Sequence, residues 1–590
     1  MLFKYLLAVL PLAAVGLAKN STYLNPILPG FHPDPSCIFV PELDNTYFCA
    51  SSSFLVFPGI PIHASKDLRT WKLISNALSR PSQLPLLNTT KRATSGIWAS
   101  TLRYHSGRFY IFSTHVFDDY PKNATNRFDN LVFSTTNPYS SSAWSDPLHF
   151  NFPGYDVSPF WHDDGMLYIT GTFAWEVSPG IQMFTLDLIT GSTGPILNIW
   201  NGTGASAPEG PHIYHRDGYY YLLIAEGGTG AGHMVSIARA KRITGPYESN
   251  PSNPVLTNND SPERYFQNLG HADLFRDRRG QWWAVALSVR QAKEDGSYPM
   301  GRETVMTPVT WKEGKWPIFE PVTGKMEGWE LDEEDVSEEG EGSLVTEGDG
   351  VDFMPGENLK PEFVHWRFPV QGSYEISPEE HEESLQLVSS EANLTGRDGR
   401  SAEGKGQTFI GRRQVDSLFK FSVEFDVSEL KVPEQEVGVT VFLDQLHHYD
   451  LGLVISSSNN NNSNNSTPHP YPLLRLRGIT TVPTFTSPTI VTLPIPTSWF
   501  LPKPNPNPSP PITHLTFQIR MSNLTHYTFS AGPVGKPSLM QDIGFAPALG
   551  LTWGFTGALV GVYASSNGGS EGFRTWVRGW RYVGEGQVIE

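Results

Sequence analysis

A turn residue followed by an aromatic strand recurs five times in the first half of this 590-residue chain. The copies read NTYF at 45–48, GRFY at 107–110, GMLY at 165–168, GYYY at 218–221 and GQWW at 280–283. Their turn residues lie 62, 58, 53 and 62 residues apart, which is enough for four antiparallel strands and their turns. Such a repeat is the sequence signature of a β-propeller. The sequence therefore predicts a five-bladed β-propeller at residues 19–325.

The second half lacks this repeat but keeps the alternation of apolar and polar residues that is typical of strands. Examples are FKFSVEF at 419–425 and the segment 551–563. The chain is 12% aromatic and contains 54 Gly and 48 Pro. This composition favours many short strands and turns with little helix. We therefore predict an all-β protein in which a β-sandwich at residues 359–590 follows the propeller.

An acidic, glycine-rich stretch at 327–352 separates the two halves. It contains DEED at 332–335 and EEGE at 338–341. Such a composition is typical of a solvated linker or a mobile loop. We predict an acidic linker at residues 326–358.

The N-terminus has the features of a secretory signal. Lys4 precedes an apolar run, and the small residues Gly16 and Ala18 lie at a plausible cleavage site. We predict a signal peptide at residues 1–18 and a secreted, extracellular glycoprotein, because sequons begin at Asn20, Asn88, Asn123, Asn201, Asn259, Asn393 and Asn523. A retained membrane anchor is the alternative, but the apolar run is short for a span, and no later segment reaches that length.

Charge and cysteine content exclude further classes. The net charge is −17, which argues against a nucleic-acid partner because phosphate binding requires a basic surface. Two cysteines cannot form a disulfide framework. Cys37 and Cys49 flank a predicted hairpin turn near Leu43, so a disulfide and two free thiols are both open.

The register of the repeat predicts where a functional site lies. Nine residues before the last four turn glycines stand Trp98, Asp156, Glu209 and His271, and eleven residues before the first turn residue stands Asp34. Equivalent positions in radially repeated blades face the same place. We therefore expect these five side chains to converge on one mouth of the central channel. Their apolar or proline-rich neighbours favour this over a chance alignment.

Three carboxylates at one mouth suit the hydrolysis of a glycosidic bond. One carboxylic acid protonates the leaving oxygen, and another carboxylate acts as base or nucleophile. A nearby negative charge or an apolar wall raises the pKa of the acid. Sugars also bind to aromatic surfaces and planar bidentate donors, so Phe54, Trp98 and an arginine of the fifth repeat are candidate contacts. The alternative roles are structural, with Trp98 as a core residue and His271 as a buried histidine.

The first half resembles glycoside hydrolase family 43, in particular the β-xylosidases that carry a C-terminal β-sandwich. Seven motifs run in family order: NPILPGFHPDPS at 25–36, FPGIPIHASKDL at 57–68, GIWA at 96–99, YDVSPF at 155–160, EGPHIY at 209–214 with AEGGT at 225–229, GHAD at 270–273 and GRET at 301–304. The agreement continues through GRRQ at 411–414 and GFTG at 554–557. The resemblance therefore covers both halves.

By this resemblance Asp34 is the general base that activates water, and Glu209 is the general acid. Asp156 raises the pKa of that acid and orients it. The family inverts the anomeric configuration, which implies that base and acid stand roughly 6.5–9.5 Å apart.

The resemblance also implies the sugar contacts. His271 would lie at the channel floor, and Arg302 would bind sugar hydroxyls, with Arg290 the weaker choice. Phe555 of the second domain would narrow the pocket. No cofactor is required and no metal ligand is predicted, although some family members hold calcium near the histidine equivalent to His271, and the sequence leaves that open here.

The leading prediction is an exo-acting β-1,4-xylosidase that releases xylose from plant cell-wall xylo-oligosaccharides. The alternative is an α-L-arabinofuranosidase, or an enzyme with both activities, acting on arabinoxylan or arabinan. A carbohydrate-binding propeller without catalysis is less favoured because all three carboxylates are present. Ser100 and Thr101 stand where the family often has Pro and Asp, and Val157 stands where it has Pro, which leaves the choice between xylose and arabinose open.

Overall fold

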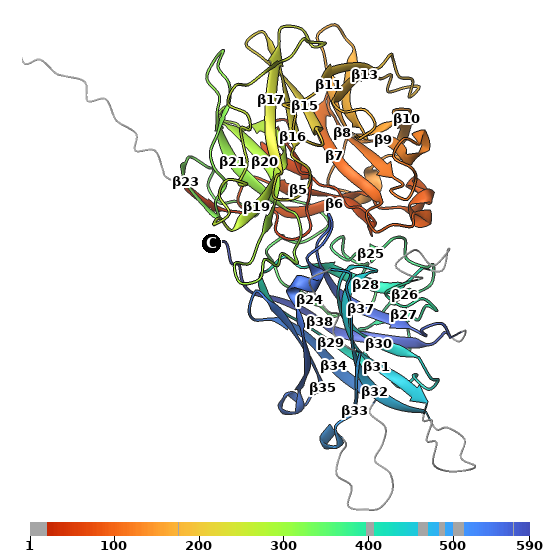
Figure 1. The fold of residues 1–590 in the computed structure, drawn as a ribbon. Coiled ribbons are helices and arrows are strands. Elements are labelled where there is room, and N and C mark those ends of the chain that lie inside the picture. Colours follow the sequence, from red (N-terminus) through yellow and green to blue (C-terminus); the bar gives the residue numbers. More distant parts are fainter. Residues whose placement is uncertain are drawn as a thin grey trace, which may run out of the picture.

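The computed structural model describes residues 21–590 except 175, 397–405, 458–469, 483–489, 500–512 and 570–571. The predicted signal peptide lies outside the described residues. Figure 1 shows a chain built almost entirely of strands and divided into two β regions, one above the other. The described residues contain no helix long and apolar enough to cross a membrane.

The N-terminal region contains five four-stranded antiparallel sheets, each made of strands that follow one another along the chain. They are β2 (Ser36–Val40), β3 (Thr46–Ala50), β5 (Gly59–Ser65) and β6 (Lys72–Leu78); β7 (Gly96–His105), β8 (Arg108–Val116), β9 (Phe128–Thr135) and β10 (Leu148–Phe150); β11 (Gly154–Trp161), β12 (Leu167–Phe173), β13 (Ile181–Thr185) and β14 (Leu197–Trp200); β15 (Glu209–Arg216), β16 (Tyr219–Glu226), β17 (Met234–Ala240) and β18 (Glu248–Ser249); β19 (Phe266–Arg276), β20 (Trp282–Arg290), β21 (Glu303–Thr310) and β22 (Ile318–Phe319).

The recurring turn residues explain the repeat. Each of them lies between the first and second strand of a sheet and has a positive φ, from 54° to 86°: Asn45, Gly107, Gly165, Gly218 and Gly280. Glycine and asparagine adopt this left-handed conformation most readily, so a tight hairpin selects them. The aromatic residues that follow begin the second strand.

The first strands of the five sheets form a closed ring. Neighbouring first strands contact each other in the order β2, β7, β11, β15, β19 and back to β2. A short strand at the start of the described chain, β1 (Ser21–Leu24), pairs with β23 (Lys325–Trp329), which follows the fifth sheet. The ring brings five segments distant in sequence to one axis.

The C-terminal region is a β-sandwich of two antiparallel sheets. One sheet contains β24 (Asp349–Val351), β26 (Tyr374–Ile376), β27 (Leu385–Val388), β29 (Leu418–Asp426), β34 (His514–Met521), β35 (His526–Pro533), β36 (Gln541–Pro547) and β38 (Arg574–Gly586). The other contains β28 (Thr408–Arg413), β30 (Glu436–Asp444), β31 (His447–Ser457), β32 (Pro470–Ile479), β33 (Val491–Pro494) and β37 (Leu559–Ser565).

The alternation along β29 confirms the prediction that this strand has one buried face. Phe419, Phe421, Val423 and Phe425 are all buried, and the residues between them are half-buried or exposed. They share one hydrophobic core with the alternating valines of β30. Two such faces packed against each other exclude water from a continuous apolar layer.

The acidic stretch between the two regions follows the first sheet rather than running free. The backbone of Glu341 donates a hydrogen bond to the Ile74 carbonyl of β6 (3.0 Å), and Ser343 accepts one from Leu73 (3.1 Å). Most of its side chains are exposed, but Asp332 is buried and pairs with Arg278 (2.5 Å). Pairing with the edge of the first sheet and an arginine contact therefore hold the stretch at these positions, while most of its side chains face solvent.

Two further contacts fix the architecture. Cys37 and Cys49 stand opposite each other in β2 and β3 and form a disulfide. Strand β25 (His365–Trp366), which belongs to the C-terminal half of the chain, pairs with β4 (Val56–Phe57) of the N-terminal region. The two regions are thus joined by backbone hydrogen bonds as well as by packing.

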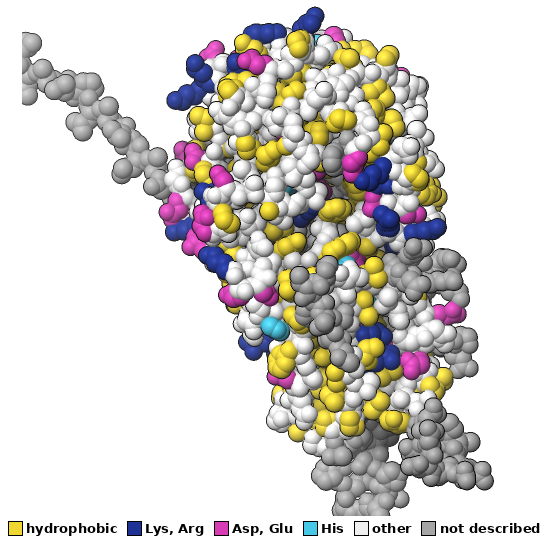
Figure 2. All heavy atoms as spheres, viewed as in Figure 1, with side chains coloured by type: hydrophobic (Ala, Val, Ile, Leu, Met, Phe, Trp, Pro, Cys, Tyr) yellow, Lys and Arg dark blue, Asp and Glu magenta, His cyan; other side chains and the backbone are white. Residues whose placement is uncertain are grey.

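The surface seen in Figure 2 carries basic and acidic side chains of mixed sign. Among the described residues of this face, the Lys and Arg side chains do not gather into one continuous basic surface. This distribution agrees with the net charge of −17.

Candidate active site

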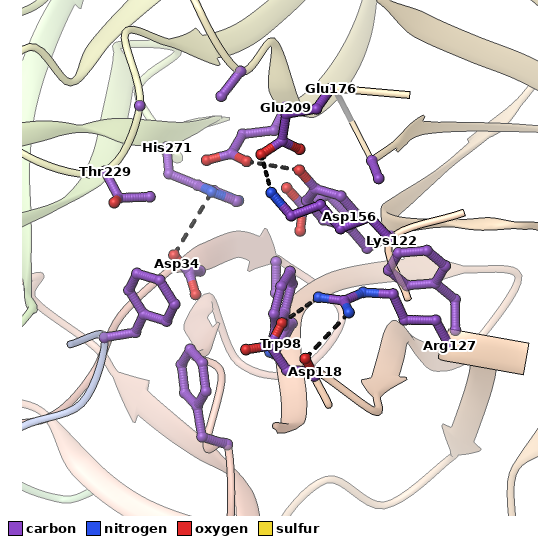
Figure 3. Close-up of a pocket in the computed structure, with 18 of the residues that line it drawn as sticks. Asp34, Trp98, Asp118, Lys122, Arg127, Asp156, Glu176, Glu209, Thr229 and His271 are labelled. Atoms are coloured by element: carbon purple, nitrogen blue, oxygen red, sulfur yellow. Dashed lines mark hydrogen bonds and ion pairs between the residues drawn. The ribbon is translucent and has the colours of Figure 1, made fainter. Parts of the chain in front are cut away.

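A cavity of about 400 Å³ opens at the axis of the five-sheet region (Figure 3). Its volume lies in the range of roughly 300–1,000 Å³ that is typical of small-molecule sites. Eight of the nine predicted site residues line it: Asp34, Phe54, Trp98, Asp156, Glu209, His271, Arg302 and Phe555. The five residues chosen by register therefore do converge on one pocket.

A recurring irregularity of the first strands places these side chains. The pairing register with the second strand shifts beside Trp98, Asp156, Glu209 and His271. A β-bulge of this kind bends the strand and re-aims a side chain. Asp34 lies just before the start of β2 and has no such partner strand.

Several pocket residues have a left-handed backbone. The φ angles are 51° at Asp34, 48° at Phe54, 56° at Asp156 and 48° at His271. For residues with a Cβ this conformation costs of order 1–3 kcal/mol each and persists only where the surroundings enforce it. Its clustering around one pocket is typical of a functional site.

Asp34 is buried and held by two neighbours. Its Oδ2 accepts a hydrogen bond from the Ser52 hydroxyl at 2.5 Å. Its Oδ1 lies 3.6 Å from Nδ1 of His271. Figure 3 marks this contact with a dashed line. Burial lowers the pKa of His271, although the charge of Asp34 opposes this. These contacts orient the carboxylate toward the cavity.

Glu209 is half-buried at the start of β15, and its Oε2 accepts a hydrogen bond from the Tyr155 hydroxyl at 3.0 Å. Burial raises the pKa of Glu209 to about 7, and the charge of Asp34 adds to the rise. The Tyr155 hydrogen bond and the Arg302 charge act in the opposite direction. A carboxyl with this pKa keeps its proton into the neutral range and can act as an acid.

Asp156 lies beside Glu209 and is fixed by the backbone. Its Oδ2 accepts a hydrogen bond from the Gly210 amide at 2.9 Å. Burial raises the pKa of Asp156 well above its ordinary value, and the charges of Glu209 and Asp34 add to the rise. Like charges in one buried site cannot all be ionised at little cost, so the two carboxyls titrate as a pair.

Aromatic rings and one arginine form the wall of the pocket. Trp98 meets Tyr155 edge to face, with ring centroids 5.2 Å apart. Phe555 of the sandwich lies 5.9 Å from Phe54, and the guanidinium carbon of Arg302 lies 4.5 Å from the Phe555 ring centre. The C-terminal region therefore completes a wall that the five sheets leave open.

The rim carries residues that the repeat did not predict. Lys122 forms an ion pair with Glu176, and Arg127 forms one with Asp118 (Figure 3). These residues come from the loops of the second and third sheets and have no equivalent register position. Tyr155 was also missed, although its place directly before Asp156 is a usable signal.

Arg290 does not line the cavity, so its assignment as a sugar contact is wrong. Its side chain is fully buried and forms an ion pair with Glu303 at 2.7 Å. It also donates hydrogen bonds to Ser417 (3.0 Å) and Gln587 (2.7 Å) of the C-terminal half. The sequence shows that an arginine is present near the fifth repeat. Only the fold shows that Arg290 joins the two halves of the chain instead of facing the cavity.

Carboxylates, histidines and an arginine surround His271, near which some family members hold calcium. Calcium prefers six to eight oxygen ligands. The carboxylates of Asp34 and Asp273 lie near His271, together with two histidines and the guanidinium of Arg302, which repels a cation. Within the described ranges, no group of three His, Cys, Asp or Glu is placed to hold a metal ion.

Known proteins share this arrangement. The profile of Glycosyl hydrolases family 43 matches residues 23–317, and that of the Beta xylosidase C-terminal Concanavalin A-like domain matches residues 351–465. The non-reducing end alpha-L-arabinofuranosidase BoGH43B of Bacteroides ovatus is 36% identical over 75% of this chain and 77% of its own length. A xylosidase/arabinosidase of Butyrivibrio fibrisolvens is 37% identical over 51% of this chain and 57% of its own length.

A solved structure extends the similarity to both regions. The xylan beta-1,4-xylosidase of Bacillus halodurans superposes with a TM-score of 0.78 at 26% identity, covering 95% of this chain and all of that one. The likeness therefore includes the sandwich and its position beside the five sheets. The chain belongs to glycosyl hydrolase family 43 and is a glycoside hydrolase.

Proposed function

We propose that this enzyme is an exo-acting β-1,4-xylosidase that inverts the anomeric configuration. The observation that carries the proposal is a pocket at the axis of the five sheets that is lined by both Asp34 and the raised-pKa carboxyl of Glu209. Phe555 from the sandwich narrows this pocket, and a narrow pocket favours a chain end over the middle of a polymer. The similarity to a xylan beta-1,4-xylosidase over 95% of the chain supports the choice of substrate.

Asp34 acts as the general base in this proposal. Ser52 and His271 fix its two oxygens, so one lone pair faces the cavity, where a water molecule attacks the anomeric carbon. The carboxylate takes the proton of that water as the carbon–oxygen bond forms.

Glu209 acts as the general acid. It transfers its proton to the leaving glycosidic oxygen as the old carbon–oxygen bond breaks. Asp156 is a second buried carboxyl beside Glu209 that orients the acid, and its hydrogen bond to the Gly210 amide keeps it in place. Phe54, Trp98 and Phe555 supply the apolar faces for the sugar ring, Arg302 donates to its hydroxyls and His271 forms the floor.

A second candidate is α-L-arabinofuranosidase activity in the same pocket. The arabinofuranosidase of Bacteroides ovatus is similar over three quarters of this chain. The xylosidase/arabinosidase of Butyrivibrio fibrisolvens carries both activities in its name. A pentofuranose presents hydroxyls and an apolar face to the same arginine and aromatic rings, so one pocket serves both sugars.

The wider setting of the enzyme is also part of the proposal. We interpret the five sheets as the five blades of a propeller at residues 19–325, joined through residues 326–358 to a sandwich at 359–590. We propose a secreted glycoprotein that acts on plant cell-wall oligosaccharides, with no nucleic-acid or membrane partner. The Cys37–Cys49 disulfide supports this because such bonds persist in oxidising compartments. Exposed sequon residues such as Asn123 and Asn201 also support it.

The test compares kcat/KM for nitrophenyl β-xyloside, nitrophenyl α-L-arabinofuranoside and xylobiose. We expect the highest value on the xylosides, and α-xylose as the first product by proton NMR. A higher value on the arabinofuranoside would replace the leading activity with the second candidate. Initial release of β-xylose would remove Asp34 from its role as the base for water.

A further inference from the structure

The indole of Trp98 is oriented by a loop. Its Nε1 donates a hydrogen bond to the Thr94 carbonyl at 2.9 Å. Thr94 lies at the end of a segment that begins with a short 3₁₀ turn at Pro85–Thr89 and continues through the exposed residues Lys91 and Arg92. The end of this segment is held within its own sheet, because the Thr94 hydroxyl donates a hydrogen bond to Asp118, and a second anchor at Thr90 would fix its other end.

Arg367 provides that anchor from the C-terminal half of the chain. The residue is 4% exposed. Its Nε and Nη2 both donate to the Thr90 carbonyl, at 3.1 and 2.9 Å, and its Nη1 donates to Oε1 of Gln445 at 2.6 Å. The planar fork of the guanidinium therefore joins the loop to the sandwich in one fixed geometry.

The backbone of Arg367 reaches the other side of the same wall. Its amide donates to the Leu55 carbonyl at 2.7 Å, directly after the pairing of β25 with β4. Leu55 follows Phe54, and Phe54 exchanges backbone hydrogen bonds with Ile97 at 2.8 and 2.9 Å. One residue thus holds both segments that meet at Trp98.

The conformation of Arg367 indicates that this contact is enforced. Its φ is 64°, a left-handed value that is strained for a non-glycine residue. The hydrogen bonds on both sides of the residue offset this strain only when the two regions are docked. Docking of the sandwich onto the five sheets therefore explains both the strained backbone of Arg367 and its hydrogen bonds to the two sides of the pocket wall.

We propose that Arg367 is a positioning residue that couples the docking of the sandwich to the orientation of Trp98 and Phe54, and so sets the affinity for the sugar rather than the rate of bond cleavage. The inference rests on the proposed function only in that these two rings contact the sugar. None of the hydrogen bonds of Arg367 described above runs to Asp34, Asp156 or Glu209.

Replacing Arg367 by lysine keeps the charge but loses the fork. A single ammonium cannot hold Thr90 and Gln445 in the same geometry, so the loop gains freedom, and the Trp98 ring has to be ordered on binding. Because ordering one side chain on binding weakens affinity, we expect KM to rise by up to about tenfold. We expect kcat to stay within about twofold and the pH profile to keep its limbs, because the carboxyls are untouched.

The experiment uses the full chain and measures KM, kcat and the pH profile on nitrophenyl β-xyloside and xylobiose. Arg412→Lys is the matched control, since Arg412 is a buried arginine of the sandwich whose ion pair with Asp349 (2.5 Å) lies outside the pocket. Arg367→Lys should raise KM, and the control should leave KM unchanged. Equal KM values in a folded Arg367→Lys variant would overturn the proposal.

A double-mutant cycle separates positioning from general stability. Trp98→Phe removes the indole N–H that Thr94 receives, so adding Arg367→Lys to it should raise KM much less than in the wild type. If the two substitutions raise KM by factors that simply multiply, Arg367 and Trp98 are not coupled.

A second variant keeps the proposal testable if Arg367→Lys does not fold. Gln445→Met removes one hydrogen-bond partner of the Arg367 guanidinium and should also raise KM. An unchanged KM in this variant would overturn the proposal. A wild-type enzyme that hydrolyses neither xyloside contradicts the proposed function instead.

Discussion

The five-sheet region and the sandwich use their strands in opposite ways. The sandwich turns alternate residues of each strand into a shared apolar core, as Phe419 to Phe425 in β29 show. The five-sheet region also buries apolar residues, but it interrupts the first strand of four of its five sheets and places a polar or aromatic side chain at each interruption. In our proposal the first region supplies the chemistry and most of the sugar contacts, and the second completes the pocket and adds to the affinity. Substitutions in the two regions should therefore fail in different ways.

The largest effect should come from removing the sandwich altogether. A chain truncated near residue 355 loses Phe555 and Arg367 and exposes Phe54 and its neighbours to water. We expect insoluble or inactive protein, measured as soluble yield and as turnover of xylobiose. A soluble fragment with full activity would show that the five sheets form the site alone, and would contradict the proposed role of the sandwich in the pocket.

Asp34→Ala should have the next largest effect, confined to kcat. Loss of a general base typically lowers the rate about 10²- to 10⁴-fold. The thermal unfolding transition should change little, because the base acts chiefly in the transition state. Activity within about tenfold of the wild type would remove Asp34 from the mechanism.

Glu209→Ala should damage the two substrate types unequally. Xylobiose has a poor leaving group and needs the proton, whereas a dinitrophenyl xyloside has a leaving group that departs unaided. Turnover of xylobiose should therefore fall far more than turnover of the aryl xyloside. Because Glu209 is active when protonated and its pKa is raised to about 7, wild-type activity should decline as the pH rises through that value.

On the aryl xyloside, Glu209→Ala should not show the decline of activity at high pH, because the titrating acid has been removed. Equal losses on both substrates, or a limb that persists, would assign the acid elsewhere, with Glu226 the next residue to test. Glu226 is buried and binds the Thr203 amide at 2.8 Å, just before the strand that carries Glu209.

Phe555→Ala tests the contribution of the sandwich without removing it. The substitution takes away the ring between Phe54 and Arg302, so we expect KM to rise about tenfold, a loss of about 1.4 kcal/mol, with kcat less affected. Phe545, which is exposed on the same region, is the matched control, and Phe545→Ala should leave both constants unchanged. A fall in kcat alone would show that the sandwich takes part in the chemistry.

Asp156→Asn should give the smallest change, a shift of the pH profile. Asparagine removes a negative charge beside Glu209 but keeps an oxygen for the Gly210 amide. The pKa of Glu209 should fall, and the high-pH limb should move to lower pH. A pH–rate profile measured on xylobiose checks this, and a limb that stays in place would mean that Asp156 does not tune the acid.

Much of the site could be predicted because it follows the repeat. Asp34, Trp98, Asp156, Glu209 and His271 occupy equivalent positions of five similar units, and a ring of such units brings equivalent positions together. The alternation in β29 likewise identified its buried face. Both signals are periodic, and both depend on the backbone geometry of strands.

The other features of the site and of the acidic stretch could not be predicted, because they depend on contacts that do not recur along the sequence. Lys122 and Glu176 meet at the rim because two loops happen to approach each other, and the sequence carries no register for that. Arg290 and Arg302 are both arginines near the end of the fifth sheet, but only one faces the pocket. The acidic stretch was expected to be solvated from its composition, and its pairing with β6 depends on an open strand edge that composition does not reveal.

The meeting of Phe54 and Phe555 also sets when the enzyme can begin to work. These rings are 501 residues apart in the chain but lie 5.9 Å apart in the pocket. A ribosome adds roughly 5–20 residues per second, so the strands that carry Asp34 and Glu209 emerge many seconds before the last wall of the pocket. The order of synthesis therefore delays completion of the pocket. A nascent or prematurely terminated chain contains all three carboxyls but lacks Phe555, the last wall of the site.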